Sequence, residues 1–150
     1  MTIRPAAPGD EPALLSLIRA LARFERLEDT VTGSAEALAR DLFGARPACE
    51  ALLAEDGGVA VGYALYFTTY STFLTKPGLW LEDLFVLESH RRRGIGLALL
   101  TEVRRIAEAR GCGRFEWSVL DWNEKAIALY ERFGATVMPD WRICRVTFGE

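Results

Sequence analysis

A short basic turn, Arg91-Arg92-Arg93-Gly94-Ile95-Gly96, has the residue types that bind an anion. Two glycines two positions apart let the backbone curl tightly and turn its N–H groups toward a ligand. The turn opens a stretch with helical spacing, and the start of a helix adds positive potential at the same point. The pattern therefore predicts a cradle for a phosphate or diphosphate. Its structural alternative is a basic turn that only caps a helix.

Two other nucleotide-binding loops do not fit this turn. A Walker loop requires the string GxxxxGK[ST], which the chain lacks. A dinucleotide fingerprint requires a third glycine or alanine three positions after the second glycine, and Leu99 stands there. The turn alone therefore does not indicate which phosphate-containing ligand binds, and the rest of the chain must indicate it.

Two adjacent carboxylates, Glu82 and Asp83, interrupt the apolar run Leu79–Val86 that leads into the turn. A charged group in a buried strand is costly, so each carboxylate needs either a function or a partner. Glu82 is the first candidate for a general base. The structural alternative for both is ion pairing with arginines. His90, the only histidine, has no evident nucleophile beside it and is not expected to be catalytic.

The elements that position these residues follow from residue periodicity and turn signals. The run Leu79–Val86 predicts a central strand, and the apolar spacing after the turn predicts a long helix that Gly111 stops. The other expected strands are Thr2–Arg4, the hairpin Ala51–Tyr70 with its turn at Asp56-Gly57-Gly58, Arg114–Leu120, Ala135–Val137 and Arg142–Phe148. The other expected helices are one capped by Asp10 and ending near Phe24, one from Ser34 to Phe43, and one that Asn123 caps and Gly134 ends. Residues 71–78 are expected to form a loop.

The whole chain indicates one α/β domain over residues 1–150. It is 50% hydrophobic and 26% charged, as in ordinary globular domains, and a net charge of −3 argues against a general nucleic-acid or membrane binder. The first residues lack a signal-peptide core, and no apolar run reaches about 18 residues. Three cysteines without metal-ligand spacing favour a reduced, cytoplasmic protein without a metal.

Two segments resemble the GNAT N-acetyltransferases, which bind acetyl-coenzyme A. The turn fits that family's [Q/R]-x-x-G-x-[G/A] diphosphate loop, and Asp121 to Ala135 fits its segment with an Asn followed by A-x-x-L/F-Y-x-x-x-G-F/A. With the order of elements, the resemblance covers the full length. It implies a mixed, mostly antiparallel central sheet flanked by helices.

A closer resemblance is to the diamine acetyltransferases, the spermidine/spermine N1-acetyltransferases and their thialysine-acetylating relatives. The string Leu81-Glu82-Asp83-Leu84-Phe85-Val86 is the most specific segment, and Phe24-Glu25 fits an aromatic-Glu pair of that branch. Ser71 stands where the polyamine enzymes carry an acidic residue, which favours the thialysine type. The implied reaction is acetyl transfer to a primary amine of a small cationic acceptor: a diamine, a polyamine, or a lysine- or thialysine-like amino acid.

The resemblance also implies roles for particular residues. Tyr130 would protonate the departing thiolate, and Glu82 would deprotonate the amine; the alternative for Tyr130 is a place on an apolar helix face. The implied coenzyme-binding residues are Leu84, Phe85, Val86, Arg91, Arg92, Arg93, Gly94, Ile95, Gly96, Leu97, Asn123, Ala126 and Tyr130. A plain helix cap is the alternative for Asn123. The implied substrate-binding residues are Phe24, Glu25, Glu82, Asp83 and Trp141, with Glu28 as a further acidic candidate.

Related enzymes are dimers, so a homodimer is expected, in which the terminal strand Trp141 to Phe148 could reach the partner's site. Two other functions stay open. One is acetylation of a protein N-terminus or an antibiotic amine. The other is a coenzyme A sensor without catalysis.

Overall fold

The computed structural model describes residues 1–149, which fall into two compact units. The first unit, Met1–Trp117, contains a five-stranded sheet and the helices α1, α2 and α3. The second unit begins at Ser118 and contains the helix α4 (Glu124–Phe133). None of the helices in the described part of the chain has the length and apolar character that a membrane crossing requires.

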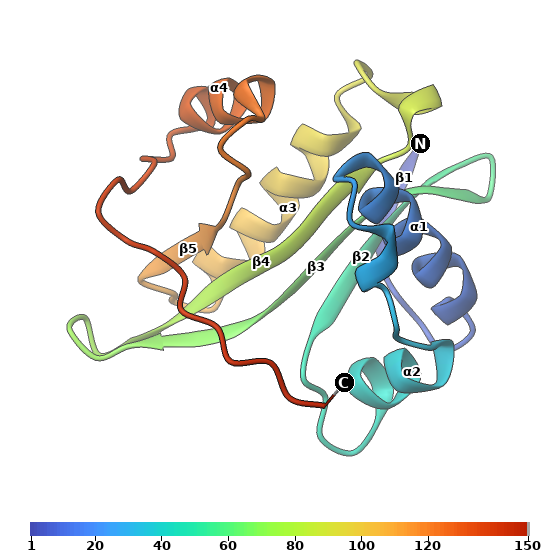
Figure 1. The fold of residues 1–150 in the computed structure, drawn as a ribbon, viewed down its shortest axis with the longest axis horizontal. Helices are drawn as coiled ribbons and strands as arrows, with labels where there is room; N and C mark the ends of the chain where they lie inside the picture. The colour runs from blue at the N-terminus through green and yellow to red at the C-terminus, as the bar shows by residue number, and fades with distance from the viewer. Residues whose placement is uncertain (150) are drawn as a thin grey trace. The chain divides into compact units, whose positions relative to one another are not determined.

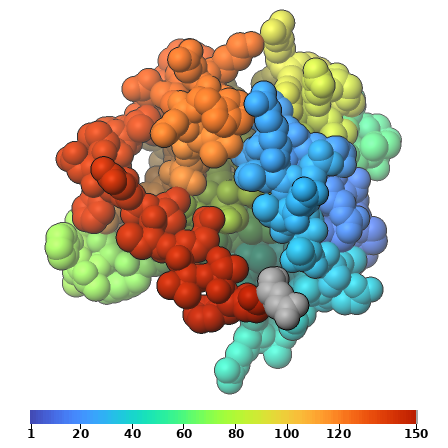
Figure 2. All heavy atoms as spheres, in the orientation of Figure 1, coloured from blue at the N-terminus to red at the C-terminus, as the bar shows by residue number. Residues whose placement is uncertain are grey.

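The sheet has the order β1-β2-β3-β4-β5 (Figure 1). Its strands are β1 (Thr2–Pro5), β2 (Glu50–Asp56), β3 (Val59–Ser71), β4 (Lys76–Val86) and β5 (Arg114–Trp117). The first four pair antiparallel, and β5 pairs parallel to β4. The turn of the β3–β4 hairpin projects beyond the sheet (light green in Figure 2), with Phe73 94% exposed. The predicted α/β class and mostly antiparallel sheet are confirmed.

The helices of the first unit cover both faces of this sheet. They are α1 (Glu11–Phe24), α2 (Ala35–Phe43) and α3 (Ile95–Ala109). On one face, Tyr63 and Phe85 belong to a core cluster with Leu14 and Leu17 of α1. On the other face, a Cβ at Gly62 would lie 3.5 Å from Leu99 of α3. Because neighbouring strand residues point to opposite sides, α1 and α3 lie on opposite faces.

One irregularity interrupts the pairing of β3 with β4. Leu65 pairs with Asp83, and the next residue, Tyr66, pairs with Leu81, so Glu82 has no partner residue on β3. An extra residue of this kind is a β-bulge, which bends the strand and re-aims its side chains. It places the adjacent carboxylates Glu82 and Asp83 at the one point where β4 departs from regular pairing.

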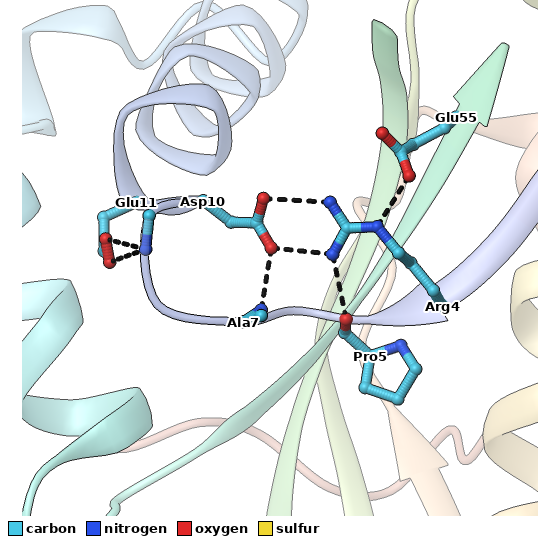
Figure 3. A network of polar contacts seen from close by, with 7 residues as sticks. Arg4, Pro5, Ala7, Asp10, Glu11 and Glu55 are labelled. Atoms are coloured by element: carbon cyan, nitrogen blue, oxygen red, sulfur yellow. Dashed lines mark hydrogen bonds and ion pairs between the residues drawn. The ribbon is translucent and has the colours of Figure 1, made fainter. Parts of the chain in front are cut away.

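The start of α1 is fixed by a polar network around Arg4 (Figure 3). The Arg4 guanidinium donates to both carboxylate oxygens of Asp10, at 2.8 and 2.9 Å, and to Glu55 of β2 at 2.6 Å. Asp10 also accepts from the Ala7 amide at 2.7 Å. Asp10 is therefore at the predicted cap position, but its carboxylate holds Arg4 and Ala7 and does not bond an amide of the helix.

Several predicted boundaries were wrong. β4 begins at Lys76, so the loop expected over residues 71–78 is shorter, and β5 ends at Trp117 instead of Leu120. The expected strands Ala135–Val137 and Arg142–Phe148 are absent, and residues 135–149 contain no helix or strand. Their alternating apolar residues resemble a strand in sequence, but Trp141 and Phe148 are 78% and 90% exposed. Alternation predicts a strand only where a sheet edge is available to pair with it.

Candidate active site

Three acidic side chains of the first unit act on one another at the bulge. Asp83 accepts a hydrogen bond from the Tyr63 hydroxyl, 2.8 Å from its Oδ2. Glu82 accepts one from the indole Nε1 of Trp80, at 3.1 Å. Glu25 follows the last residue of α1 and adds its charge to the same cluster. We call Glu25, Glu82 and Asp83 the acidic cluster.

The half-buried carboxyl of Asp83 has a raised pKa. Burial, opposed by the Tyr63 hydrogen bond and aided by the charges of Glu82 and Glu25, raises the pKa of Asp83 to about 6. Burial also raises the pKa of Glu25. The pKa of Tyr63 is raised far above its ordinary value, chiefly by burial and then by the charge of Asp83. Tyr63 therefore stays protonated and acts only as a donor to Asp83.

The acidic cluster has no cationic partner within residues 1–149. None of the ion pairs formed there involves Glu25, Glu82 or Asp83. The structural alternative, pairing with arginines, is therefore not found. Glu25 and Asp83 are half-buried and Glu82 is exposed, so a cation from outside the chain can reach carboxylates that no residue of the described chain neutralises.

The basic turn has the backbone shape that its glycines predict. Arg92 and Gly94 both adopt left-handed conformations, with φ of 63° and 77°. The first backbone hydrogen bond of α3 joins the Ala98 amide to the Gly94 carbonyl at 3.0 Å. The amides of Ile95, Gly96 and Leu97 thus lie in the first turn of a 15-residue helix, where they have no acceptor in the helix itself. This donor set suits the oxygens of a diphosphate.

The three arginines of the turn have different surroundings. Arg91 lies over the rings of Phe24 and Phe85, 4.6 and 5.4 Å from their centroids, and its Nε donates to the Val86 carbonyl at 3.0 Å. Arg93 contacts Asp56 at 3.3 Å. The side chain of Arg92 is exposed. Arg91 therefore connects the end of α1 to the end of β4, a contact that the sequence did not predict.

Asp56, the last residue of β2, also contacts His90, whose Nε2 lies 3.1 Å from the carboxylate. Arg93 and then His90 lower the pKa of Asp56. The only histidine is thus a structural contact that ties the start of the basic turn to the hairpin.

The far end of β4 extends beyond its parallel neighbour. The last pair between β4 and β5 is Leu81 with Trp117, and β4 continues to Val86. Its remaining edge, which includes Leu84 and Phe85, pairs with no strand of residues 1–149 on the β5 side. The side chains of Phe85 and Val86 are buried, so only their backbone groups are suited to a ligand.

The second unit holds the other predicted site residues. The Asn123 side chain accepts from the Ala126 amide at 3.3 Å and caps α4, as its structural alternative states. Tyr130 lies in the second turn of α4 and is half-buried. Trp141 lies in the segment without helix or strand. The roles inferred for these residues in coenzyme or substrate binding stay predictions.

Comparison with known proteins decides the family. The sequence pattern of the acetyltransferase (GNAT) family matches residues 16–135. The chain belongs to the GNAT acetyltransferase family. A thialysine N-epsilon-acetyltransferase of Sus scrofa is 42% identical over 141 residues, which are 89% of this chain and 82% of that protein. The L-ornithine N5-acetyltransferase NATA1 of Arabidopsis thaliana is 34% identical over 190 residues, covering 97% and 83% of the two chains.

The fold of this GNAT acetyltransferase also matches solved structures. An integron cassette protein from the mobile metagenome of V. cholerae superposes with a TM-score of 0.81 at 24% identity, covering 98% of this chain and 92% of that one. The resemblance inferred from the sequence, to the GNAT family and its diamine and thialysine acetyltransferase branch, is confirmed. The prediction that the chain is an N-acyltransferase is confirmed with it.

Two residues of the site were missed by sequence reasoning. The sequence places Tyr63 in the hairpin Ala51–Tyr70 and Trp80 in the run Leu79–Val86, and neither was assigned a role. The strand register brings Tyr63 opposite Phe85, two residues from Asp83 and on the same face. A regular hairpin register drawn from the sequence would miss this arrangement, because the bulge at Glu82 shifts the pairing of β3 with β4 by one residue.

Proposed function

We propose that this enzyme transfers the acetyl group of acetyl-coenzyme A to a primary amine of a small cationic acceptor. The acceptor class comprises diamines, polyamines and amino acids of the lysine or thialysine type. The named relatives act on thialysine and ornithine, which supports an amino acid that carries a second amine.

The observation that carries this proposal is the acidic cluster without a cationic partner. A second ammonium group on the acceptor would supply the missing positive charge at Asp83, where burial strengthens the attraction. A neutral amine would leave the carboxylates uncompensated. The cluster thus favours acceptors with two positive charges over acceptors with one.

The basic turn supports acetyl-coenzyme A as the acetyl donor. When bound, this cosubstrate supplies the acetyl group as a thioester, and its diphosphate is the part that suits the turn. The amides from Arg92 to Leu97 would bind the phosphate oxygens, and the exposed Arg92 side chain would add a full charge. The free edge of β4 at Leu84 and Val86 would offer backbone groups to the rest of the molecule.

The different exposure of Glu82 and Asp83 suggests different chemical roles for these two carboxylates. An alkyl ammonium has a pKa of about 10.4, so the acceptor must lose a proton before its nitrogen bonds to the acetyl carbon. Glu82 is the more exposed carboxylate and would take that proton through water, while Asp83 holds the positive charge. Tyr130 would donate its phenolic proton to the sulfur as the carbon–sulfur bond breaks. Its role rests on the family resemblance.

The test is an acetylation assay that measures thiol release with a panel of amines. The decisive pair is 1,4-diaminobutane against butylamine, because both offer a primary amine and only the first carries a second ammonium. We expect kcat/KM to favour the diamine about tenfold or more, since hydrogen bonds to charged groups contribute about 1.5–3 kcal/mol. Thialysine, ornithine and lysine complete the panel.

Two outcomes would count against the proposal. Equal kcat/KM for the diamine and the monoamine would remove the role of the acidic cluster. Binding of coenzyme A in calorimetry without turnover of any amine would favour the sensor instead. An Asp83→Asn variant that keeps its Tyr63 partner should lose the preference for the diamine. Glu50→Gln, a matched change at a carboxylate of β2 that already pairs with Arg110, should not.

A further inference from the structure

We propose that Tyr63 is a positioning residue of the acetyl transfer: its hydroxyl, fixed in the core beneath α1, holds the Asp83 carboxylate in place for the acceptor's ammonium group. The inference rests on the proposed function and goes beyond it, since it assigns a role to a core tyrosine.

The surroundings of Tyr63 fix the position of its hydroxyl. The side chain is fully buried and belongs to the core cluster with Leu14 and Leu17 of α1 and with Phe85 of β4. A ring held on all sides by apolar groups has little rotational freedom, so its one polar atom has a defined place. That atom lies 2.8 Å from Asp83 Oδ2. The core therefore positions a donor at the edge of the site.

The charges around Asp83 explain why it needs a donor. Glu82 lies next to it on β4, and Glu25 faces it from the end of α1. Arg91, a cation on this side of the sheet, is turned to the Phe24 and Phe85 rings and is not among the charges that act on Asp83. Within the described residues, the Tyr63 hydroxyl stabilises the ionised form of Asp83, while burial, Glu82 and Glu25 all oppose that form. Without the hydroxyl, we expect the pKa of Asp83 to rise above its value of about 6.

The experiment compares Tyr63→Phe with the parent enzyme by two readouts. The first is the titration of the Asp83 carboxyl carbon by NMR, assigned by its loss in Asp83→Asn. The second is the pH profile of kcat/KM with 1,4-diaminobutane as the probe. The amine itself contributes a slope of one to log kcat/KM below its pKa of about 10. Protonation of Asp83 should add a second slope below about pH 6.

In Tyr63→Phe we expect both the Asp83 titration and the break in the rate profile to move upward by about one pH unit, the effect of one lost hydrogen bond to a charged group. The KM of the amine at pH 7 should rise more than kcat falls. Tyr66→Phe is the matched control, since Tyr66 is a buried tyrosine of the same strand that points to the α3 face. It should change neither readout.

The outcomes separate this inference from the proposed function. An unmoved Asp83 titration in Tyr63→Phe would overturn the role of Tyr63, whatever the enzyme acetylates. A moved titration with an unmoved rate profile would also overturn it, because Asp83 would then not govern the amine. Absence of turnover in the parent enzyme would overturn the proposed function, and the titration would still measure the hydrogen bond.

Discussion

At the residue scale, the raised pKa of Asp83 lowers the free energy of unfolding at neutral pH. Its carboxyl has the ordinary Asp pKa of about 3.8 in the unfolded chain and a pKa of about 6 in the folded protein. Between these values the folded state holds a proton that the unfolded state has lost. The free energy of unfolding therefore falls as the pH rises from about 4 to about 6, and it stays lower at neutral pH.

This sign gives a prediction for Asp83→Asn. The variant should be more stable than the parent at pH 7 by roughly 2–3 kcal/mol, and the difference should vanish near pH 3, where Asp83 is largely protonated in both states. Urea unfolding of both proteins at the two pH values checks it. Asp56 and Glu50, whose pKa values are lowered by arginines, act in the opposite direction, but they are common to both proteins and cancel. A stability gain of equal size at both pH values would mean that Asp83 does not carry the penalty.

At the scale of elements, the basic turn and α3 form the anion-binding unit that we propose. Gly94 adopts φ of 77°, and nothing lies within 4 Å of a Cβ built there. Gly111, just past the other end of α3, has nearly the same conformation, with φ of 71° and equally open space. Any other residue would therefore be strained to a similar degree at either position. The two positions differ in that they lie at opposite ends of α3.

This pair makes a controlled prediction. Gly94→Ala and Gly111→Ala should each lower the free energy of unfolding by about 1 kcal/mol, because alanine is strained at positive φ. Only Gly94→Ala should also weaken coenzyme A binding, by about tenfold, since a shift of the turn moves several amides that are proposed to bind the diphosphate. Calorimetric titration with coenzyme A distinguishes the two. Equal losses of affinity in both variants would point to general destabilisation.

The elements that the sequence predicted well are those whose signals are local. Ser34 caps α2 through the Ala37 amide, and Gly134 ends α4 with φ of 107°, as both residue types indicate. The contact of Arg91 with Phe24 and Phe85 and the Tyr63–Asp83 hydrogen bond could not be predicted in the same way. Both depend on register between segments that are far apart in the chain, and the bulge at Glu82 shifts that register by one residue.

On the scale of the whole molecule, the two units differ in how their backbone is secured. In the first unit, the sheet and its helices enclose the core. After Ala135, whose amide donates to the Tyr130 carbonyl, no backbone-to-backbone hydrogen bond is formed by the amides of residues 136–149 within the described chain. Ile143 and Val146 in this segment are 68% and 79% exposed. Residues 136–149 therefore do not form the strand that their alternating apolar residues predict, because their backbone has no neighbouring strand in the described chain to pair with.

Hydrogen exchange tests this difference. Amides of residues 136–149 should exchange within seconds, while those of β3 and α3 should be protected for far longer, because only the latter are hydrogen-bonded inside a core. The measurement should be made over a range of protein concentrations. Protection of the segment that rises with concentration would indicate pairing with a second copy, in line with the homodimer that the family resemblance implies. Protection at every concentration would restore the strand predicted from the sequence.

The bulge described above also means that β4 carries one residue more than its pairing uses. Leu81 and Asp83 already pair with adjacent residues of β3, so removal of Glu82 would join them into an uninterrupted ladder and leave Leu79 and Leu81 facing α3 as before. A single-codon deletion at this point should therefore give a protein that melts cooperatively, near or above the parent temperature, and that no longer acetylates. The surplus residue serves the chemistry that we propose, and the pairing of β3 with β4 is complete without it.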